Sequence, residues 1–256
     1  MRGYGQYCPI ARASEVFAER WTPLIVRNLA LGCETFSDIL RGAPGLSRTL
    51  LAARLRELQR HGLLSRDQGP GHSVRYRLTE AGTDLWQVCL ALGAWGVRWL
   101  ELAPEHLDPY PVLWAMCRSA APAALPDHRV VVRLDFPMLR PPNRFWLLYE
   151  HGGAEVCVHS PGGEEDLVVV ADPAAFTRWH MGWTTWAQAV RSGHIAVTGP
   201  RDLARAFPTW NPHSRFADVR PEPHVLAAAP ATRPVRRPAD TAEPKPAQAA
   251  DRQQMH

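Results

Sequence analysis

Residues 47–78 read SRTLLAARLRELQRHGLLSRDQGPGHSVRYRL and contain the pattern that decides the fold. Ser47 is a favoured N-cap of a helix, and Gly62 is a favoured stop. Three leucines between them recur at the i, i+4, i+7 spacing of one helical face: Leu51, Leu55 and Leu58. We therefore predict a helix from residue 47 to residue 61, held on its domain by this leucine stripe.

A β-hairpin is expected directly after this helix. Residues 64–66 and 74–78 are strand-like, and the segment Gly69-Pro-Gly-His72 between them provides a Pro/Gly turn. The turn has basic residues on both sides. The sequence therefore predicts a long helix followed by a basic hairpin.

Two further helices are expected upstream. Residues 36–41 predict a short helix. A tight Gly/Pro turn separates it from the helix over residues 47–61, which is the third helix of the module. Residues 14–31 predict an earlier helix, capped by Ser14 and kinked or broken near Trp21, because Pro23 interrupts it. Two helices joined by a tight turn, then a helix and a hairpin, follow the order of a winged helix-turn-helix.

The outer side of the third helix has the composition of a DNA-reading surface. Arg48 and Thr49 can reach base edges, and small side chains such as Ala52 allow close approach to the major groove. The other arginines are expected to contact phosphates, which position a protein without carrying sequence information, and the hairpin adds contacts to the adjacent minor groove or backbone. The candidate DNA-binding residues are Ser47, Arg48, Thr49, Ala52, Ala53, Arg54, Arg56, Arg60, His72 and Arg75.

The distribution of charge agrees with this hypothesis. The chain has a formal net charge of only +4, but residues 41–77 contain eight arginines against Glu57 and Asp67. Such a cluster is typical of a phosphate-binding surface. An ordinary solvated basic face is the alternative.

Several short motifs lie at spaced positions between residues 7 and 103. They are Tyr7-Cys-Pro-Ile10, Arg20-Trp21, Phe36-Ser-Asp-Ile-Leu-Arg41, Pro44-Gly-Leu-Ser47, Leu51-Ala-Ala-Arg-Leu-Arg-Glu-Leu58, Gly62-Leu63 and Tyr76-Arg-Leu-Thr-Glu80. Together they resemble the HxlR-type family of winged-helix transcriptional regulators, in which a lysine more often precedes the tryptophan. The resemblance implies a dimeric DNA-binding module, with the third helix in the major groove and the hairpin as the wing. Repression is expected by analogy with the family.

The same resemblance raises a redox hypothesis for Cys8. This cysteine lies where redox-sensing members of the HxlR family carry a reactive thiol, and Arg12, one helical turn onward, could stabilise its thiolate. The alternative is that Cys8 is a small buried hydrophobic residue.

Dimerisation is also expected from the last helix of this module, which Thr79 caps and which runs over residues 80–102. Apolar residues occupy almost its whole circumference: Leu85, Trp86, Val88, Leu90, Leu92, Trp95, Val97, Trp99 and Leu100. Such a helix must be covered by its own domain and by something else. Two-fold pairing would place two reading helices about 34 Å apart on a palindromic double-stranded site. Burial under a second domain of the same chain is the alternative.

The residues after Pro109 predict an α+β domain over 109–218. Strand-like runs are followed by helix-like runs, which favours a mainly antiparallel sheet. The predicted strands are 129–136, 144–150, 155–159, 166–171 and 194–198, and the predicted helices are 173–181, 183–191 and 201–207.

Part of this region resembles the sterol carrier protein-like lipid-binding fold. The segments are Asp166-Leu-Val-Val-Val-Ala-Asp172, Trp186-Ala-Gln-Ala-Val-Arg-Ser-Gly193 and His194-Ile-Ala-Val-Thr-Gly199. The resemblance implies a sheet and helices around an apolar tunnel, which in a regulator would sense a small apolar ligand. The candidate lining residues are Trp146, Phe176, Trp179, Met181, Trp183 and Trp186, although an ordinary core or a purely structural, dimerising domain would also use them.

The remaining features set limits on the function. Residues 221–256 contain seven prolines and are expected to be a disordered tail. Five scattered cysteines without a C-x-x-C pair fit a reducing cytoplasm and predict neither a disulfide framework nor a zinc site. A secretory signal and a membrane span are not expected. Because no catalytic elbow, phosphate-binding glycine loop or metal-spaced His pair is found, we expect neither an enzyme nor a cofactor.

Overall fold

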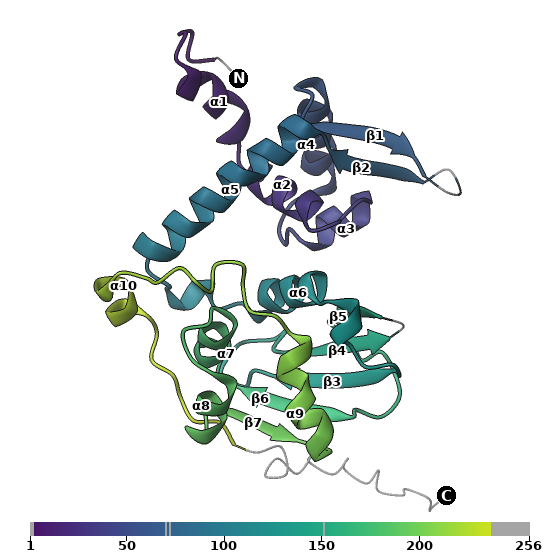
Figure 1. Cartoon of the computed structure of the whole chain (residues 1–256), viewed down its shortest axis with the longest axis vertical. Coiled ribbons are helices and arrows are strands. Elements are labelled where there is room, and N and C mark those ends of the chain that lie inside the picture. Colours follow the sequence, from purple (N-terminus) through teal and green to yellow (C-terminus); the bar gives the residue numbers. More distant parts are fainter. Residues whose placement is uncertain (1–2, 70, 72, 151, 237–256) are drawn as a thin grey trace, which may run out of the picture.

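A computed structural model describes residues 3–69, 71, 73–150 and 152–236, which form an N-terminal and a C-terminal region, each with its own hydrophobic cluster (Figure 1). The N-terminal elements are α1 (Pro9–Phe17), α2 (Thr22–Ala30), α3 (Phe36–Arg41), α4 (Arg48–Arg60), β1 (Leu64–Gln68), β2 (Val74–Leu78) and α5 (Glu80–Trp99). The C-terminal elements are α6 (Pro109–Ser119), β3 (Val130–Asp135), β4 (Arg144–Glu150), β5 (Gly153–Cys157), β6 (Leu167–Ala171), α7 (Pro173–His180), α8 (Trp186–Arg191), β7 (Ile195–Thr198), α9 (Arg201–Trp210) and α10 (Pro223–Ala228). Short 3-10 turns cover Pro104–His106 and Pro122–Ala124.

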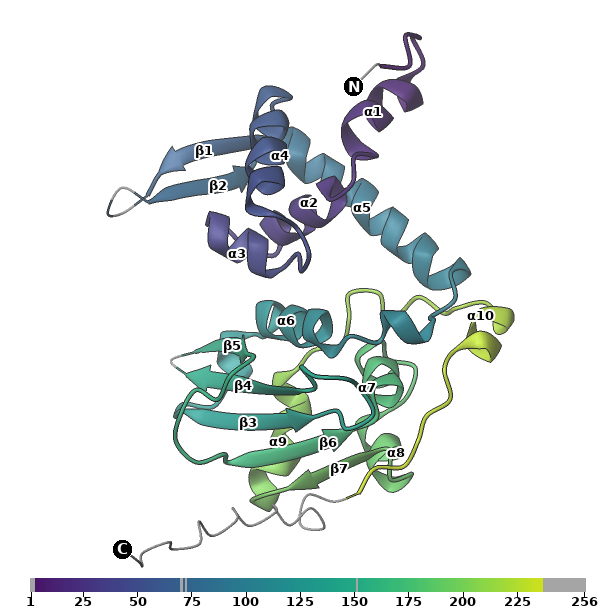
Figure 2. The ribbon, with the colours of Figure 1, turned by 180° about the vertical axis from the view of Figure 1, so that it is seen from behind.

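Local capping signals position the helices of the winged helix-turn-helix. The Ser47 side chain accepts a hydrogen bond from the Leu50 amide at 3.2 Å, as expected for the N-cap of α4. The Thr79 side chain accepts one from the Gly82 amide at 3.2 Å and starts α5. Figure 2 shows the β1–β2 hairpin projecting away from the helices, as a wing does.

The prediction of a helix capped by Ser14 is wrong, because Ser14 lies inside α1. Cys8 occupies the N-cap, and Pro9 follows at the first helical position, where its missing amide proton costs nothing. The predicted break near Trp21 is confirmed: Trp21 has a left-handed backbone with φ of 80°, and α2 starts directly after it.

Strand register holds the wing on the helical core. β1 and β2 pair antiparallel from Leu64 opposite Leu78 to Gln68 opposite Val74. The Tyr76 amide also donates to the Glu34 carbonyl at 2.8 Å, which ties β2 to the segment between α2 and α3. The wing is therefore anchored through β2.

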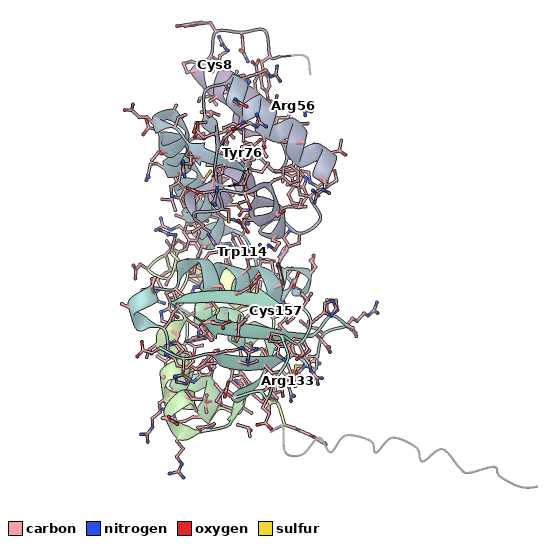
Figure 3. All side chains as sticks on the ribbon, turned by 90° about the vertical axis from the view of Figure 1, so that its right-hand side faces the viewer. Cys8, Arg56, Tyr76, Trp114, Arg133 and Cys157 are labelled. Carbon is pink, nitrogen blue, oxygen red and sulfur yellow. The ribbon has the colours of Figure 1, made fainter. Side chains whose placement is uncertain are left out.

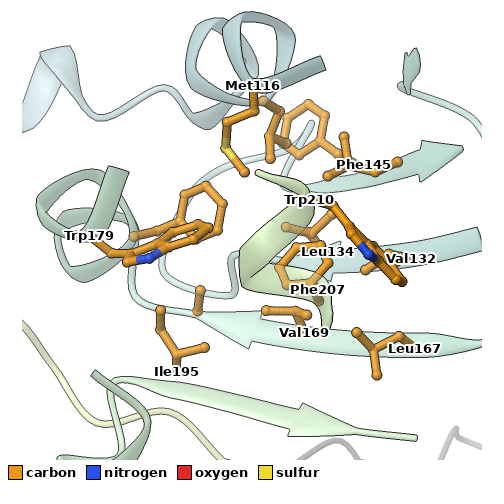
Figure 4. Close-up of a cluster of buried hydrophobic side chains, with 14 of the residues drawn as sticks. Met116, Val132, Leu134, Phe145, Leu167, Val169, Trp179, Ile195, Phe207 and Trp210 are labelled. Atoms are coloured by element: carbon orange, nitrogen blue, oxygen red, sulfur yellow. The ribbon is translucent and has the colours of Figure 1, made fainter. Parts of the chain in front are cut away.

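The C-terminal region is a five-stranded sheet in the order β5-β4-β3-β6-β7, with only the β3–β6 pair parallel. One face of the sheet and the helices packed on it enclose the larger hydrophobic cluster (Figure 4). Its members include Met116 of α6, Phe145 of β4, Trp179 of α7 and Phe207 of α9. The expected mixed α+β architecture with a mainly antiparallel sheet is confirmed.

Helix α6 was not predicted from the sequence, and it joins the two regions. Asp108 caps it by accepting from the Tyr110 amide at 3.0 Å. Trp114 of α6 is 6% exposed and belongs to the hydrophobic cluster of the N-terminal region. In Figure 3, Trp114 lies at the junction between the two regions.

The prediction that the chain is disordered from Pro221 onward is wrong for residues 221–236. The Glu222 amide donates to the Arg98 carbonyl at 3.0 Å, and Val225 of α10 is buried. Further on, the Val235 amide donates to the Gly193 carbonyl at 2.8 Å. The prolines therefore leave enough backbone donors and apolar surface for this segment to pack. The rest of the predicted tail lies outside the described residues.

No helix in the described ranges combines the length and apolarity needed to cross a membrane.

Candidate DNA-binding surface

Helix α4 presents a basic, small-residue face to solvent. Its leucine stripe is at most 2% exposed, which fixes the opposite side outward. The predicted reading residues on that outward side are exposed, apart from half-buried Ala52: Ser47, Arg48, Thr49, Ala52, Ala53, Arg56 and Arg60. Arg48 also extends its guanidinium over the Phe36 ring at 5.1 Å from the ring centroid.

Arg56 and Arg60 are the arginines of α4 best placed for phosphates. Both are exposed, and neither forms an ion pair with any described residue. Arg54 was predicted with them, but its side chain is only 16% exposed and is bound to Glu19 and Glu57. Arg54 therefore holds α4 against the end of α1, and its assignment as a phosphate contact is not supported by its position.

A groove lies between α4 and the wing. It has a volume of about 350 Å³ and is lined by Ala52, Leu55, Arg56, Gln59, Arg66 and Tyr76. Arg66 and Tyr76 are direct cross-strand partners, which brings them to one face of the hairpin beside Arg56. Figure 3 shows Arg56 and Tyr76 on these neighbouring elements. Gln59, Arg66 and Tyr76 were not predicted as site residues, although the register of the hairpin could have placed the last two side by side.

Two arginines of β2 are paired with one carboxylate. Arg77 binds Glu34 at 2.7 Å and Arg75 binds it at 3.1 Å. The hydrogen bond from Arg77, together with both positive charges, lowers the pKa of Glu34. Arg75 is thus half-buried and paired with Glu34, while His72 lies outside the described residues.

Helix α5 carries an apolar stripe that the described residues leave about half exposed. The stripe consists of Val88, Leu92, Trp95 and Trp99, whose exposed fractions are 46–53%. Their spacing of four, three and four residues is that of a coiled-coil seam. Elsewhere on α5, Phe216 packs so closely on Gly93 that an added Cβ would lie 2.7 Å from its Cε1. The C-terminal region therefore covers part of α5. It touches the stripe at Trp99, whose ring lies 6.5 Å from the His224 ring, and the four stripe residues remain about half exposed.

The comparisons with known proteins concern this N-terminal region. The family model described as HxlR-like helix-turn-helix matches residues 16–104. The HTH-type transcriptional regulator YvaP of Bacillus subtilis is 35% identical over 106 residues, which are 96% of YvaP and 40% of this chain. The chain belongs to the HxlR-like helix-turn-helix family. It is accordingly a helix-turn-helix DNA-binding transcriptional regulator.

A second HxlR-like relative is the HTH-type transcriptional regulator YodB of Bacillus subtilis. It is 34% identical over 97 residues, which are 87% of YodB and 37% of this chain. Crystal structures of YodB represent its reduced, diamide-treated and quinone-bound forms. The diamide-treated structure is 34% identical, with a TM-score of 0.31, covering 35% of this chain and 91% of that one.

The cysteines of this HxlR-like chain differ in their surroundings. Burial raises the pKa of Cys33 and of Cys157. It raises the pKa of Cys89 to about 11 and that of Cys117 to about 12. Cys8 is half-buried at the N-cap of α1, and its carbonyl accepts from the Arg12 amide at 2.9 Å.

Three of the residues assigned to the predicted ligand tunnel of the C-terminal region lie in its core or on the other face of the sheet. Phe176 and Trp179 are buried in the core and pack edge to face at 5.2 Å. Trp146 lies on the opposite face of the sheet, because it alternates with the buried Phe145, and it donates to Glu165 at 3.2 Å. The described cavities are lined by other residues than the six predicted ones. The alternative that these side chains form an ordinary core therefore holds for Phe176 and Trp179.

Proposed function

We propose that this regulator represses transcription as a homodimer that reads a palindromic operator with helix α4. The observation that carries the proposal is the exposed face of α4, where Arg56 and Arg60 have no carboxylate partner among the described residues. Unpaired guanidiniums beside small side chains suit close approach to a phosphate backbone.

The residues of this face have different roles in the proposal. Arg48 and Thr49, at the start of α4, read base edges in the major groove. Arg56 and Arg60 bind phosphates, and Arg66 extends the phosphate track onto the wing through the shared groove. Base readout and phosphate binding are thus separated along the helix.

Binding to DNA from upstream of the protein's own gene tests these roles. Arg48→Ala is expected to cost about 1–3 kcal/mol and to relax sequence preference. Arg60→Ala is expected to weaken binding to all sequences alike and to lower the salt dependence by about one phosphate contact. Arg205→Ala, on the exposed side of α9, is the matched control. If Arg48→Ala and Arg60→Ala both bind as tightly as the wild type, α4 is not the reading helix.

The proposed homodimer is supported by the α5 stripe. Four large side chains at coiled-coil spacing leave an apolar surface that pairing with a second copy would cover. Leu92→Glu is expected to yield monomers in sedimentation velocity, while Gln87→Glu, an exposed polar position on the same helix, stays dimeric. If the wild-type protein is still monomeric at about 100-fold the concentration used for DNA binding, the proposed dimer is refuted.

Repression is tested with a reporter gene behind the same upstream DNA. We expect expression to fall when the protein is present and to recover with Arg60→Ala. An increase in expression with the wild-type protein would make the regulator an activator.

We further propose that residues 7–103 form the winged-helix domain and residues 109–218 a sterol carrier protein-like domain that receives a small-molecule signal. The five-stranded sheet with helices packed on one face supports the second assignment. Mass spectrometry of the protein purified from its own cells tests the signal. A bound apolar molecule supports sensing, and empty protein favours a structural role.

A thiol switch at Cys8 is the second candidate for the signal. Burial raises the pKa of the other four cysteines, which makes them weak nucleophiles. The relative YodB was crystallised in diamide-treated and quinone-bound forms. If Cys8 is the switch, diamide lowers DNA affinity of the wild type but not of Cys8→Ser. An equal response of both proteins removes Cys8 from consideration.

A further inference from the structure

A cavity lies at the junction of the two regions. It has a volume of about 240 Å³ and is bounded by α3 on one side and by α6 and β5 on the other. Because pockets for drug-sized ligands measure about 300–1,000 Å³, this cavity suits a smaller molecule.

Two ion pairs of one arginine lie in the wall of the cavity. Arg41 of α3 binds Asp38 at 2.7 Å within its own region and Glu155 of β5 at 2.8 Å across the junction. The guanidinium of Arg41 therefore bridges carboxylates of both regions and is not available to a ligand.

Arg118 of α6 is different, because no described carboxylate lies within ion-pair distance of it. Its Nη2 donates to the carbonyls of Leu31 at 3.3 Å and Gly32 at 3.0 Å, at the end of α2. Arg118 is exposed, and its Nη1 and Nε have no partner among the described residues. Asp38 and Glu155 line the same cavity, but both are bound by Arg41, so the free donors of Arg118 can bind a carboxylate ligand through two hydrogen bonds.

Part of the cavity wall is aromatic or apolar. Tyr110 and Trp114, one turn apart on α6, line it together with Ala154 and Val156 of β5. The Trp114 ring is rigidly held, since it is also covered by Arg27 at 5.4 Å and inserts into the N-terminal core. Flat, fixed walls of this kind suit a planar ring.

We propose that this cavity binds a small aromatic carboxylate, with its ring against Tyr110 and Trp114 and its carboxylate on Arg118. The inference rests on the proposed signal-sensing function and names the site and the class of ligand. It moves the site from the interior of the C-terminal region to the junction between the regions.

The two thiols of the cavity fit a non-covalent ligand. Cys33 comes from the N-terminal region and Cys117 from α6, and both line the cavity. Burial raises the pKa of both, that of Cys117 to about 12, so they remain protonated and contribute apolar wall. A small carboxylate meets no reactive nucleophile there.

Occupancy of the cavity is coupled to the reading helix through α3. Asp38 and Arg41 belong to the wall and to α3, which precedes the turn into α4. A ligand that changes the spacing between α3 and β5 changes DNA affinity, and DNA then changes ligand affinity by the same factor.

Calorimetric titration of the full-length protein with benzoate and with its neutral isostere benzamide tests the site. We expect one benzoate to bind per chain. The affinity for benzamide should be lower by a factor of about ten or more. Arg118→Gln should weaken benzoate about tenfold or more, since it removes a charged donor, and Arg118→Lys should recover part of the affinity. Ala154→Leu fills the cavity and should weaken both compounds, while Arg215→Gln, an exposed arginine away from the cavity, is the matched control.

Two results overturn the proposal. One is the absence of benzoate binding up to about 10 mM, and the other is equal benzoate affinity in the wild type, Arg118→Gln and Ala154→Leu. DNA binding is measured on the same samples. Loss of benzoate binding by a protein that still binds DNA rejects the cavity alone, whereas failure to bind DNA rejects the proposed function. Coupling predicts that benzoate shifts DNA affinity in the wild type and not in Ala154→Leu, and an unchanged wild-type affinity refutes it.

Discussion

The contact between Gly42 and Trp114 gives the sharpest prediction about how the two regions depend on each other. A Cβ on Gly42 would lie 2.7 Å from Trp114 Cη2 and 2.6 Å from Asn28 Nδ2, closer than real side-chain contacts. Gly42 has an ordinary negative φ of −76°, so space alone excludes a side chain there. Gly42→Ala should therefore destabilise the protein by about 1–3 kcal/mol through overpacking.

Trp114→Ala acts on the other side of the same contact. Removing a nearly buried tryptophan should cost about 3–5 kcal/mol, and the loss should appear in the N-terminal region although the residue belongs to α6. In the double variant the alanine at position 42 gains the space of the indole. The clash with Asn28 remains. We therefore expect the destabilisation of the double variant to be about 1 kcal/mol smaller than the sum of the two single destabilisations.

Urea unfolding of the four proteins measures these costs, and hydrogen exchange of peptides from α2 and α3 locates them. Gly96→Ala is the control, because its nearest neighbour would be Leu100 at 3.9 Å and a helical alanine fits there; it should be neutral or stabilising. Additive costs in the double variant, within about 0.5 kcal/mol, would show that Gly42 and Trp114 do not touch. The α6 connection would then be refuted.

Three further substitutions test other buried polar groups. Arg54→Ala should cost about 2 kcal/mol in thermal unfolding by leaving Glu19 unpaired, and unchanged DNA affinity of the folded variant would separate it from the reading residues. Burial and, to a smaller extent, the charge of His213 lower the pKa of His180 to about 4. Folded His180 thus stays neutral where the unfolded chain takes up a proton, so stability should fall by up to about 3 kcal/mol from pH 6.5 to pH 4. His180→Gln should flatten the dependence of Tm on pH in that range, and an unaltered slope would contradict the cause. Tyr149→Phe removes a buried hydrogen bond to Asn211 of 2.8 Å and should cost about 1–2 kcal/mol in urea unfolding; no loss would contradict that bond.

The sequence predicts best what is decided locally. The helix over residues 36–41 and the strand over residues 144–150 have the predicted bounds, and the caps Ser47 and Thr79 are confirmed. Each depends on contacts within a few residues, which spacing and residue type reveal. Ser14 misled because Pro9, a stronger helix start, precedes it.

Long-range pairing explains why two predicted DNA contacts are engaged within the protein. Arg54 looks like a phosphate contact until the fold brings Glu19, 35 residues away, against it. Arg75 is matched by Glu34, 41 residues away. Both pairs depend on how α1 and the wing pack, which no local pattern encodes. The position of Trp146 could have been predicted. Neighbouring residues of a strand point to opposite faces of the sheet, and Phe145 faces the core.

The described contacts connect α6 to the winged-helix region as well as to the sheet that it covers. Trp114 completes the hydrophobic cluster under α2 and α4, and Arg118 satisfies carbonyls at the end of α2. Carbonyls at a helix end lack partners within the helix, so α2 loses stabilising bonds if α6 moves away. A signal that shifts α6 relative to the sheet must therefore also act on α2, α3 or their contacts. The C-terminal region can influence the reading helix through packed contacts, without any change in the connection between α5 and α6.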